Sequence, residues 1–338
     1  MTESKDEYLH LDPRIWQLAG SDETSRIRVI EKDLFIEHDF SQYLNAVLED
    51  FMCGPRQTRM PCLLILGDAG MGKTAQLHRF QRQFPDGHDE DTGQLQRHIV
   101  IVNVPTEPTK TSLQFSLLEA LGAPLAVRGR AIDHSGVIRR MLMAHRTKIL
   151  VFDEIQHVSH TRPRDRAVVL DTIKSISTEC QISVICAGTP SVEREFLADP
   201  QIERRFDIAK LAAWSIGAPF KRFLQTYERA RPLRIASNLG ELPMMRAILQ
   251  ETSGVTHRVI QRLNAAAIVA IHEHLERITI DLLSVKRLEP SRVIEAKRAG
   301  TVESVVEADQ LRATRRDGAK SKPRQANANT DLSATASR

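Results

Sequence analysis

Short aliphatic runs alternate with longer amphipathic stretches between about residues 60 and 212. Four of these runs contain almost no polar residue and do not alternate; they span residues 62–66, 99–104, 149–152 and 182–187. Such runs are typical of strands buried on both faces of a parallel sheet. The stretches between them have helical spacing, as in 112–121 and 168–177, and a fifth strand is expected at 207–211. The pattern therefore predicts an α/β fold with helices on both sides of a parallel sheet.

The pattern changes on either side of this region. A helix is expected from Ser41, as N-cap, to about Phe51, and further helices at 220–230, 244–251, 257–277 and 280–286. Residues beyond about 290 are polar and small, with too little apolar surface to offset the entropy lost on ordering. The predicted organisation has four parts: an N-terminal extension (1–40), an α/β domain (41–213), a small all-helical domain (214–288) and a basic, disordered tail (289–338).

Charge and composition narrow the class of protein. The net charge is +4, and residues 291–338 hold ten Lys/Arg against six Asp/Glu, which is the whole excess. A polyanion would therefore be met by a local patch or by this tail. The sequence shows no apolar window long enough for a membrane span and no secretory leader, so a cytoplasmic protein without a membrane partner is expected. The four cysteines lack metal-ligand spacing, and each is expected to be a small buried hydrophobe.

The strongest chemical signal is a complete GxxxxGK[ST] motif between the strand 62–66 and a helix expected from Lys73 to about Phe84. Glycines at such a turn let backbone N–H groups surround phosphates, and the helix N-terminus adds its positive end. We expect Lys73 to reach the β- and γ-phosphates of ATP and the Thr74 hydroxyl to bind Mg²⁺. The predicted phosphate-binding residues are Gly67, Asp68, Ala69, Gly70, Met71, Gly72, Lys73 and Thr74.

Two further strand ends carry polar residues. Asp153 and Glu154 follow the strand 149–152, where an acid lies over the phosphate site of a parallel sheet. Asp153 is a candidate ligand of Mg²⁺, directly or through water, and Glu154 is a candidate general base that polarises an attacking water. Thr189 follows the strand 182–187 and is a candidate to orient that water or to touch the γ-phosphate; the alternative is an ordinary capping turn.

Three arginines are candidates for charge stabilisation. Arg204 and Arg205 precede the fifth strand, and one of them is a candidate arginine finger that reaches the γ-phosphate of a neighbouring subunit. The sequence does not distinguish between the two, and both are also compatible with surface ion pairs. Arg258 lies at the start of the long helix of the all-helical domain and is a candidate to contact the bound nucleotide from there.

The order of these motifs resembles that of AAA+ ATPases of the initiator-like branch, over about residues 25–288. Within that branch, the stretches 59–68, 150–157 and 187–190 resemble transposon-encoded target-selection regulators of the TniB/TnsC type. The resemblance implies a five-stranded sheet. In that sheet the strand 182–187, which precedes Thr189, lies between the strand 62–66, which precedes the GxxxxGK[ST] motif (the P-loop), and the strand 149–152, which precedes Asp153. It also implies that the all-helical domain is a lid.

The same resemblance implies a function. Such proteins assemble with ATP as rings or helical filaments on double-stranded DNA, recruit a transposase together with a target-selection adaptor protein, and disassemble on hydrolysis. The alternative is a helicase-loader-like or scaffold AAA+ protein that uses ATP as a structural switch. Intact Lys73, Thr74, Asp153 and Glu154 favour the hydrolysing regulator, because a scaffold has no need of Glu154.

Candidate DNA contacts follow the second strand. Lys110 and Thr111 begin a helix, and Arg128 and Arg130 come after its end. Lysine, threonine and arginine suit contacts to the DNA backbone without base readout. The alternative is a pair of solvated turns.

Overall fold

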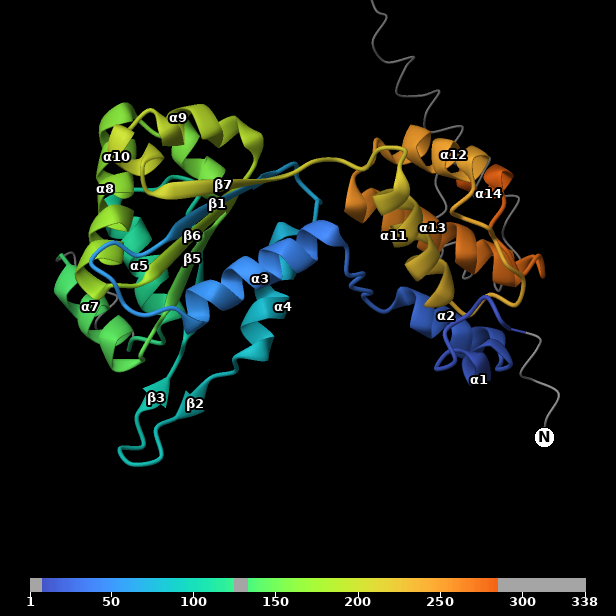
Figure 1. The fold of residues 1–338 in the computed structure, drawn as a ribbon, viewed down its shortest axis with the longest axis horizontal. Coiled ribbons are helices and arrows are strands. Elements are labelled where there is room, and N and C mark those ends of the chain that lie inside the picture. The colour runs from blue at the N-terminus through green and yellow to red at the C-terminus, as the bar shows by residue number, and fades with distance from the viewer. Residues whose placement is uncertain (1–7, 125–132, 285–338) are drawn as a thin grey trace, which may run out of the picture. The chain divides into compact units, whose positions relative to one another are not determined.

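The computed structural model describes residues 8–124 and 133–284, and its centre is a five-stranded parallel sheet (Figure 1). The strands are β1 (Cys62–Gly67), β4 (Ile99–Asn103), β5 (Ile149–Asp153), β6 (Ser183–Gly188) and β7 (Phe206–Leu211). Their order is β4-β5-β6-β1-β7, and every neighbouring pair is parallel. The predicted α/β fold is confirmed, as is the place of the Thr189 strand between the P-loop strand and the Asp153 strand.

Helices cover both faces of the sheet. Helices α3 (Asp39–Cys53) and α4 (Lys73–Gln83) lie on one face, where they pack against Leu63 and Ile65 of β1 (Figure 1). The neighbouring residues Leu64 and Leu66 point to the other face. That face is covered by α5 (Lys110–Ala120), α7 (Ser135–Ala144), α8 (Pro163–Cys180), α9 (Glu193–Leu197) and α10 (Pro200–Glu203). Apolar burial on both faces explains the unbroken aliphatic strands.

Short elements connect these layers. A hairpin of β2 (Gly87–His88) and β3 (Leu95–Gln96) follows α4, and the 3-10 turns η1 (Ile155–His160) and η2 (Pro190–Val192) follow β5 and β6. The prediction that Ser41 is the N-cap of α3 is wrong. His38 is the N-cap, and Ser41 forms the reciprocal half of a capping box, in which its Oγ accepts the backbone N–H of His38 at 2.8 Å.

The helical region after the sheet contains four described helices, α11 (Ala218–Arg229), α12 (Leu242–Thr252), α13 (Thr256–His272) and α14 (Ile280–Ser284). Helix α13 ends before the expected Arg277. His274 and Glu276 adopt φ values of 55°, in the left-handed region, which turns the chain out of the helix. The expected end of the last helix at Lys286 and the whole tail 289–338 lie outside the described residues.

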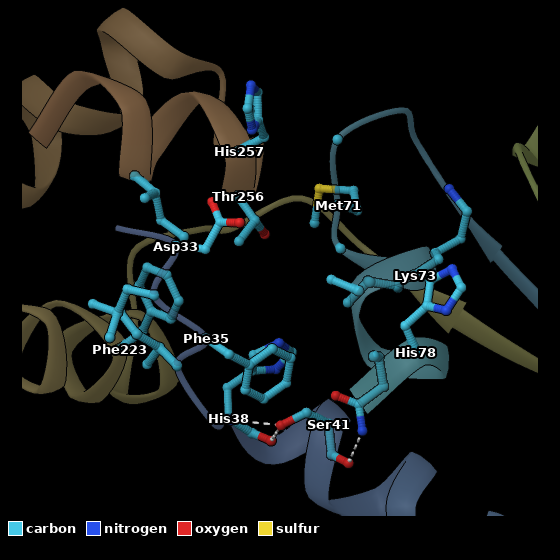
Figure 2. A pocket seen from close by; sticks show the side chains of 18 of the residues that line it. Asp33, Phe35, His38, Ser41, Met71, Lys73, His78, Phe223, Thr256 and His257 are labelled. Carbon is cyan, nitrogen blue, oxygen red and sulfur yellow. Dashed lines mark hydrogen bonds between the residues drawn. The ribbon is translucent and has the colours of Figure 1, made fainter. Parts of the chain in front are cut away.

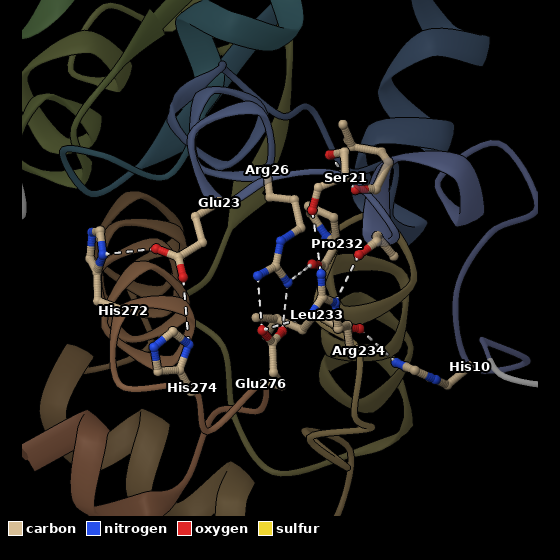
Figure 3. A network of polar contacts seen from close by, with 12 residues as sticks. His10, Ser21, Glu23, Arg26, Pro232, Leu233, Arg234, His272, His274 and Glu276 are labelled. Atoms are coloured by element: carbon tan, nitrogen blue, oxygen red, sulfur yellow. Dashed lines mark hydrogen bonds and ion pairs between the residues drawn. The ribbon is translucent and has the colours of Figure 1, made fainter.

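The N-terminal segment packs against α13 through α2 (Glu23–Glu31), whose polar contacts Figure 3 shows, and α1 (Trp16–Ala19) packs against α2. The buried Arg26 side chain donates to both carboxylate oxygens of Glu276, with Nη1–Oε2 at 2.5 Å and Nη2–Oε1 at 2.8 Å. The Glu23 carboxylate faces His272 and His274, with Oε–Nδ1 distances of 3.7 and 3.5 Å. Contacts therefore join α2 to the chain around the end of α13, whereas the domain boundaries at residues 41, 214 and 289 stay predictions.

Three of the four cysteines, Cys62, Cys180 and Cys186, are buried, as expected, and burial raises the pKa of each thiol. The expectation is wrong for Cys53, which is exposed at the end of α3. Within residues 8–124 and 133–284, no helix is both long and apolar enough to cross a bilayer.

Candidate active site

The P-loop joins β1 to α4 through glycines in conformations that other residues avoid. Gly70 has φ +80° and Gly72 φ +96°, and L-residues rarely adopt such values. Gly67 lies in close contact with β7, because a Cβ atom there would be 3.0 Å from the Leu211 carbonyl oxygen. The sequence thus folds into a tight turn at the carboxyl end of β1, an inner strand of the sheet, with α4 beginning at Lys73.

Lys73 lies inside this turn. It is 9% exposed, and its Nζ donates to the carbonyl oxygens of Gly67 and Asp68 at 2.6 and 3.1 Å. Burial lowers the pKa of Lys73 below its ordinary value, although the charges of Asp153 and Glu154 oppose that shift. The loop therefore holds a cationic group among its carbonyl oxygens, next to two carboxylates.

Thr74 and Asp153 meet at the ends of two different elements. The Thr74 hydroxyl, in the first turn of α4, donates to the Asp153 carboxylate at 2.6 Å (Oγ1–Oδ2). Asp153 is the last residue of β5 and is 1% exposed, and its other carboxylate oxygen accepts the Glu154 backbone N–H at 2.8 Å. A hydroxyl and a carboxylate at this separation are the oxygen donors that fit Mg²⁺.

Glu154 follows β5 in a left-handed conformation, with φ 58° and ψ 34°, and is exposed. Its carboxylate accepts a hydrogen bond from the side-chain amide Nε2 of Gln156. The Oε1 of the same amide accepts the backbone N–H of Thr189 at 3.2 Å, just beyond the end of β6. The Thr189 hydroxyl lies 2.8 Å from the Ser191 hydroxyl. Sequence reasoning selected Glu154 and Thr189 but missed Gln156, although it belongs to the stretch 150–157 that carried the family resemblance.

The three candidate arginines have different surroundings. Arg205 is half-buried, and its Nη1 donates to the Thr178 hydroxyl at 2.8 Å. Arg204 is exposed at the end of α10, and within the described residues its side chain makes no hydrogen bond or ion pair. Arg258 is exposed in the first turn of α13, next to His257, whose backbone N–H donates to the Gly70 carbonyl oxygen at 2.9 Å. The start of α13 therefore touches the P-loop, while the Arg258 side chain faces solvent.

A cavity of about 640 Å³ lies beside the P-loop (Figure 2). Lys73 and Met71 bound it on one side, and His257 lies at the start of α13 above it. Aromatic side chains, including Phe35 and Phe223, bound it on the other side. The volume is in the range of pockets that hold small ligands. Asp153, Glu154 and Thr189 are not among its lining residues, so the cavity and the two carboxylates flank the P-loop separately.

Trp214 connects this cavity to the linker after β7. Its indole N–H donates to the Thr256 hydroxyl at 3.0 Å, and its backbone N–H donates to the Gly254 carbonyl oxygen at 2.9 Å. The ring lies 4.7 Å from the Phe223 ring and 5.3 Å from the His38 ring, centroid to centroid. Trp214 thus packs against His38 and Phe223, two residues that line the cavity and come from distant parts of the chain.

The candidate DNA contacts are only partly described. Lys110 begins α5, is 43% exposed at its side chain, and pairs with Asp133 at 2.7 Å. The hydrogen bond from Lys110 is the largest of several that lower the pKa of Asp133 below its ordinary range. Thr111 is exposed beside it. Arg128 and Arg130 lie outside the described residues.

The P-loop lies at the end of the inner strand β1, the acidic strand β5 lies two places away in the order β4-β5-β6-β1-β7, and helices follow the sheet; this is the P-loop AAA+ fold. The sequence model of the family described as "TniB: Bacterial TniB protein" matches residues 26–216. The chain belongs to this family. A comparison with curated proteins finds no match.

Solved structures with a similar fold include two ORC proteins and a Cdc6p protein. The Aeropyrum pernix ORC1 protein in complex with DNA is 18% identical, with a TM-score of 0.52 over 76% of this chain and 67% of that chain. The Aeropyrum pernix ORC2 protein, in ADPNP–ADP complexes, is 17% identical, with a TM-score of 0.51 over 81% and 79%. Cdc6p from Pyrobaculum aerophilum is 14% identical, with a TM-score of 0.52 over 76% and 68%. At these identities the likeness shows the fold.

Proposed function

We propose that this protein is an ATP-dependent, DNA-binding regulator of transposition that hydrolyses ATP to ADP and phosphate. The observation that carries the proposal is the contact between Thr74 and Asp153 directly beside a P-loop with an inserted lysine. Membership of the TniB family supports the link to transposition. The DNA-bound state of the ORC1 structure supports a DNA partner, because the two chains share a fold.

Nucleotide binding would use both sides of the P-loop. The backbone N–H groups of residues 67–74 would surround the phosphates, and Lys73 would exchange its contacts with the Gly67 and Asp68 carbonyls for phosphate oxygens. The aromatic cavity would hold the base, since Phe35 and Phe223 provide flat apolar surfaces next to the loop. Arg258 would need to rotate from solvent toward the phosphates.

The carboxylate side would carry the chemistry. Thr74 and Asp153 would hold Mg²⁺, which when bound neutralises phosphate charge and helps to align the leaving group. Glu154 would accept a proton from water as the water oxygen bonds to the γ-phosphorus and the bond to the β–γ bridging oxygen breaks. Thr189 would orient this water from the end of β6.

Assembly would complete the site. Arg204 suits the arginine finger better than Arg205, because its exposed side chain has no partner within the described residues, whereas Arg205 is bonded to Thr178. Hydrolysis would then depend on a ring or filament on double-stranded DNA in the cytoplasm. That assembly would recruit the transposase and a target-selection adaptor, and hydrolysis would dismantle it.

Two substitutions test the proposal. Lys73→Ala should abolish ATP binding, because the phosphates lose their buried positive charge. Glu154→Gln should keep ATP binding but lower turnover by about 10²–10⁴-fold, the usual contribution of a water-activating group, and should trap the DNA-bound assembly. The exposed residues Lys221 and Glu90 provide matched controls as Lys221→Ala and Glu90→Gln. Wild-type hydrolysis by Glu154→Gln would contradict the proposed mechanism.

A further inference from the structure

Gln156 joins the two catalytic candidates that lie at the ends of neighbouring strands. It is half-buried in η1, two residues after Glu154, and both ends of its side-chain amide are used. Its Nε2 donates to the Glu154 carboxylate, and its Oε1 accepts the Thr189 backbone N–H at 3.2 Å. We propose that Gln156 is a positioning residue: its amide holds the Glu154 carboxylate in a place that depends on where the end of β6 lies. This inference rests on the proposed ATP hydrolysis.

The packing around Gly188 supports the bridge independently of the hydrogen bonds. Gly188 is buried at the end of β6, and a Cβ atom at this position would lie 2.8 Å from the Gln156 Oε1 and 3.2 Å from its backbone nitrogen. A Cβ contact of 2.8 Å is essentially never seen, but the Gln156 Oε1 atom ends a flexible side chain that can shift. The Gln156 backbone nitrogen has no such freedom, and the 3.2 Å contact with it is tight, so glycine favours the close approach of β6 to this turn. The approach brings the Thr189 N–H within reach of the amide.

The backbone of the η1 turn holds Gln156 from the other side. The positive φ of Glu154 reverses the chain immediately after β5, and the His157 N–H closes the turn on the Glu154 carbonyl oxygen at 3.1 Å. The His157 Nδ1 lies 2.8 Å from the Val104 carbonyl oxygen, just after β4. The turn that carries Gln156 is therefore tied to the ends of β4 and β5, and the Gln156 amide links it to the end of β6 through Thr189.

This arrangement gives the amide a defined task. The Glu154 carboxylate is oriented by a donor that does not itself touch the phosphate site. A displacement of Thr189 by a bound γ-phosphate would move the acceptor end of the amide, and the donor end would move with it because the amide is planar. A shift of the β6 end would thus also shift the carboxylate of the general base Glu154, through the Gln156 amide. A displacement of about 1 Å at a catalytic group can lower a rate on the order of 10²-fold.

The decisive experiment compares nucleotide affinity with turnover in full-length protein. Gln156→Met removes both hydrogen bonds at similar length, and Gln156→Glu keeps the acceptor for Thr189 but places a carboxylate against Glu154. We expect both variants to bind a fluorescent ADP analogue within about threefold of wild type, and kcat to fall by at least about tenfold, in the range set by misplaced catalytic groups. Gln250→Met, on the exposed face of α12, serves as the control with unchanged kcat.

A double variant separates positioning from general disruption. If Gln156 acts only through Glu154, Glu154→Gln combined with Gln156→Met should turn over no more slowly than Glu154→Gln alone, since effects of residues that act as a unit do not add. Wild-type kcat in both Gln156 variants, an equal loss of ADP affinity and kcat, or an additive double variant would overturn the inference while leaving the proposed function intact. Normal hydrolysis by Glu154→Gln would instead overturn the proposed function, and this inference with it.

Discussion

Replacing Arg26 by alanine should strongly destabilise the protein, because it breaks a buried ion pair from one side. The Arg26 side chain is 1% exposed and that of Glu276 is 11% exposed, and the guanidinium contacts both carboxylate oxygens. Without Arg26, the nearest cation to Glu276 among residues 8–124 and 133–284 is Arg234, at 3.7 Å. Removing one partner of a buried pair costs about 3–5 kcal/mol. We therefore expect the free energy of unfolding to fall by roughly that amount.

The measurement is urea unfolding followed by circular dichroism, with two comparisons. Arg28→Ala, on the exposed face of the same helix, should change the free energy of unfolding by less than about 0.5 kcal/mol. The double variant Arg26→Met with Glu276→Leu should be more stable than Arg26→Ala, because no unpaired charge is left in the interior. A loss below about 1 kcal/mol in Arg26→Ala, the range of an exposed pair, would refute the reasoning.

The same pair predicts a pH dependence. Burial raises the pKa of Glu276, but the hydrogen bonds and charge of Arg26 outweigh it, so the pKa lies below the ordinary value of 4.5. A carboxyl group with a lowered pKa stabilises the fold above its ordinary pKa, and that contribution is lost as the pH falls toward the folded value. The stability difference between wild type and Glu276→Gln should therefore shrink as the pH drops below 4.5. A difference independent of pH would contradict this assignment.

Three further outcomes are expected. Lys110→Glu should weaken binding to unrelated DNA duplexes alike and leave ATP affinity of the monomer near normal; a loss for one sequence alone, or none, would argue against backbone contact. Deletion of residues 291–338 should leave folding and basal ATP hydrolysis intact. The deletion should also weaken DNA association at low salt or uncouple the protein from its transposase. If DNA binding across a salt titration and transposition were both unchanged, the tail would have no role in either. A thiol reagent should label Cys53 rapidly in native protein, whereas equal labelling of the buried Cys186 would contradict the described packing.

The sheet was predictable because its strands are unbroken aliphatic runs. The predicted strands 62–66 and 149–152 agree with β1 and β5 to within one residue. A strand that is buried on both faces contains almost no polar residue, so its ends are easy to recognise in the sequence. The position of β6 in the sheet could not come from such runs, which say nothing of strand order. The family resemblance supplied it.

The parts of the site that belong to one local motif could be predicted from the sequence. The parts that form where residues distant in sequence come together could not. The P-loop and Asp153 follow from spacing and strand ends. The aromatic side of the cavity required Phe35 and Phe223 to come together from distant positions in the sequence. Arg26 looks like an ordinary surface arginine in sequence, because its partner Glu276 lies 250 positions away. Gln156 gave no signal of its own, since its role depends on the ends of two strands that only the folded sheet places side by side.

Electron microscopy of the full-length protein with duplex DNA and a non-hydrolysable ATP analogue tests the central claim most directly. The account predicts rings or helical filaments around the DNA that form only with the nucleotide and do not form with Lys73→Ala. Single particles that do not assemble on DNA in the presence of the analogue, or assemblies that form equally well without nucleotide, would contradict an ATP-dependent, DNA-bound regulator.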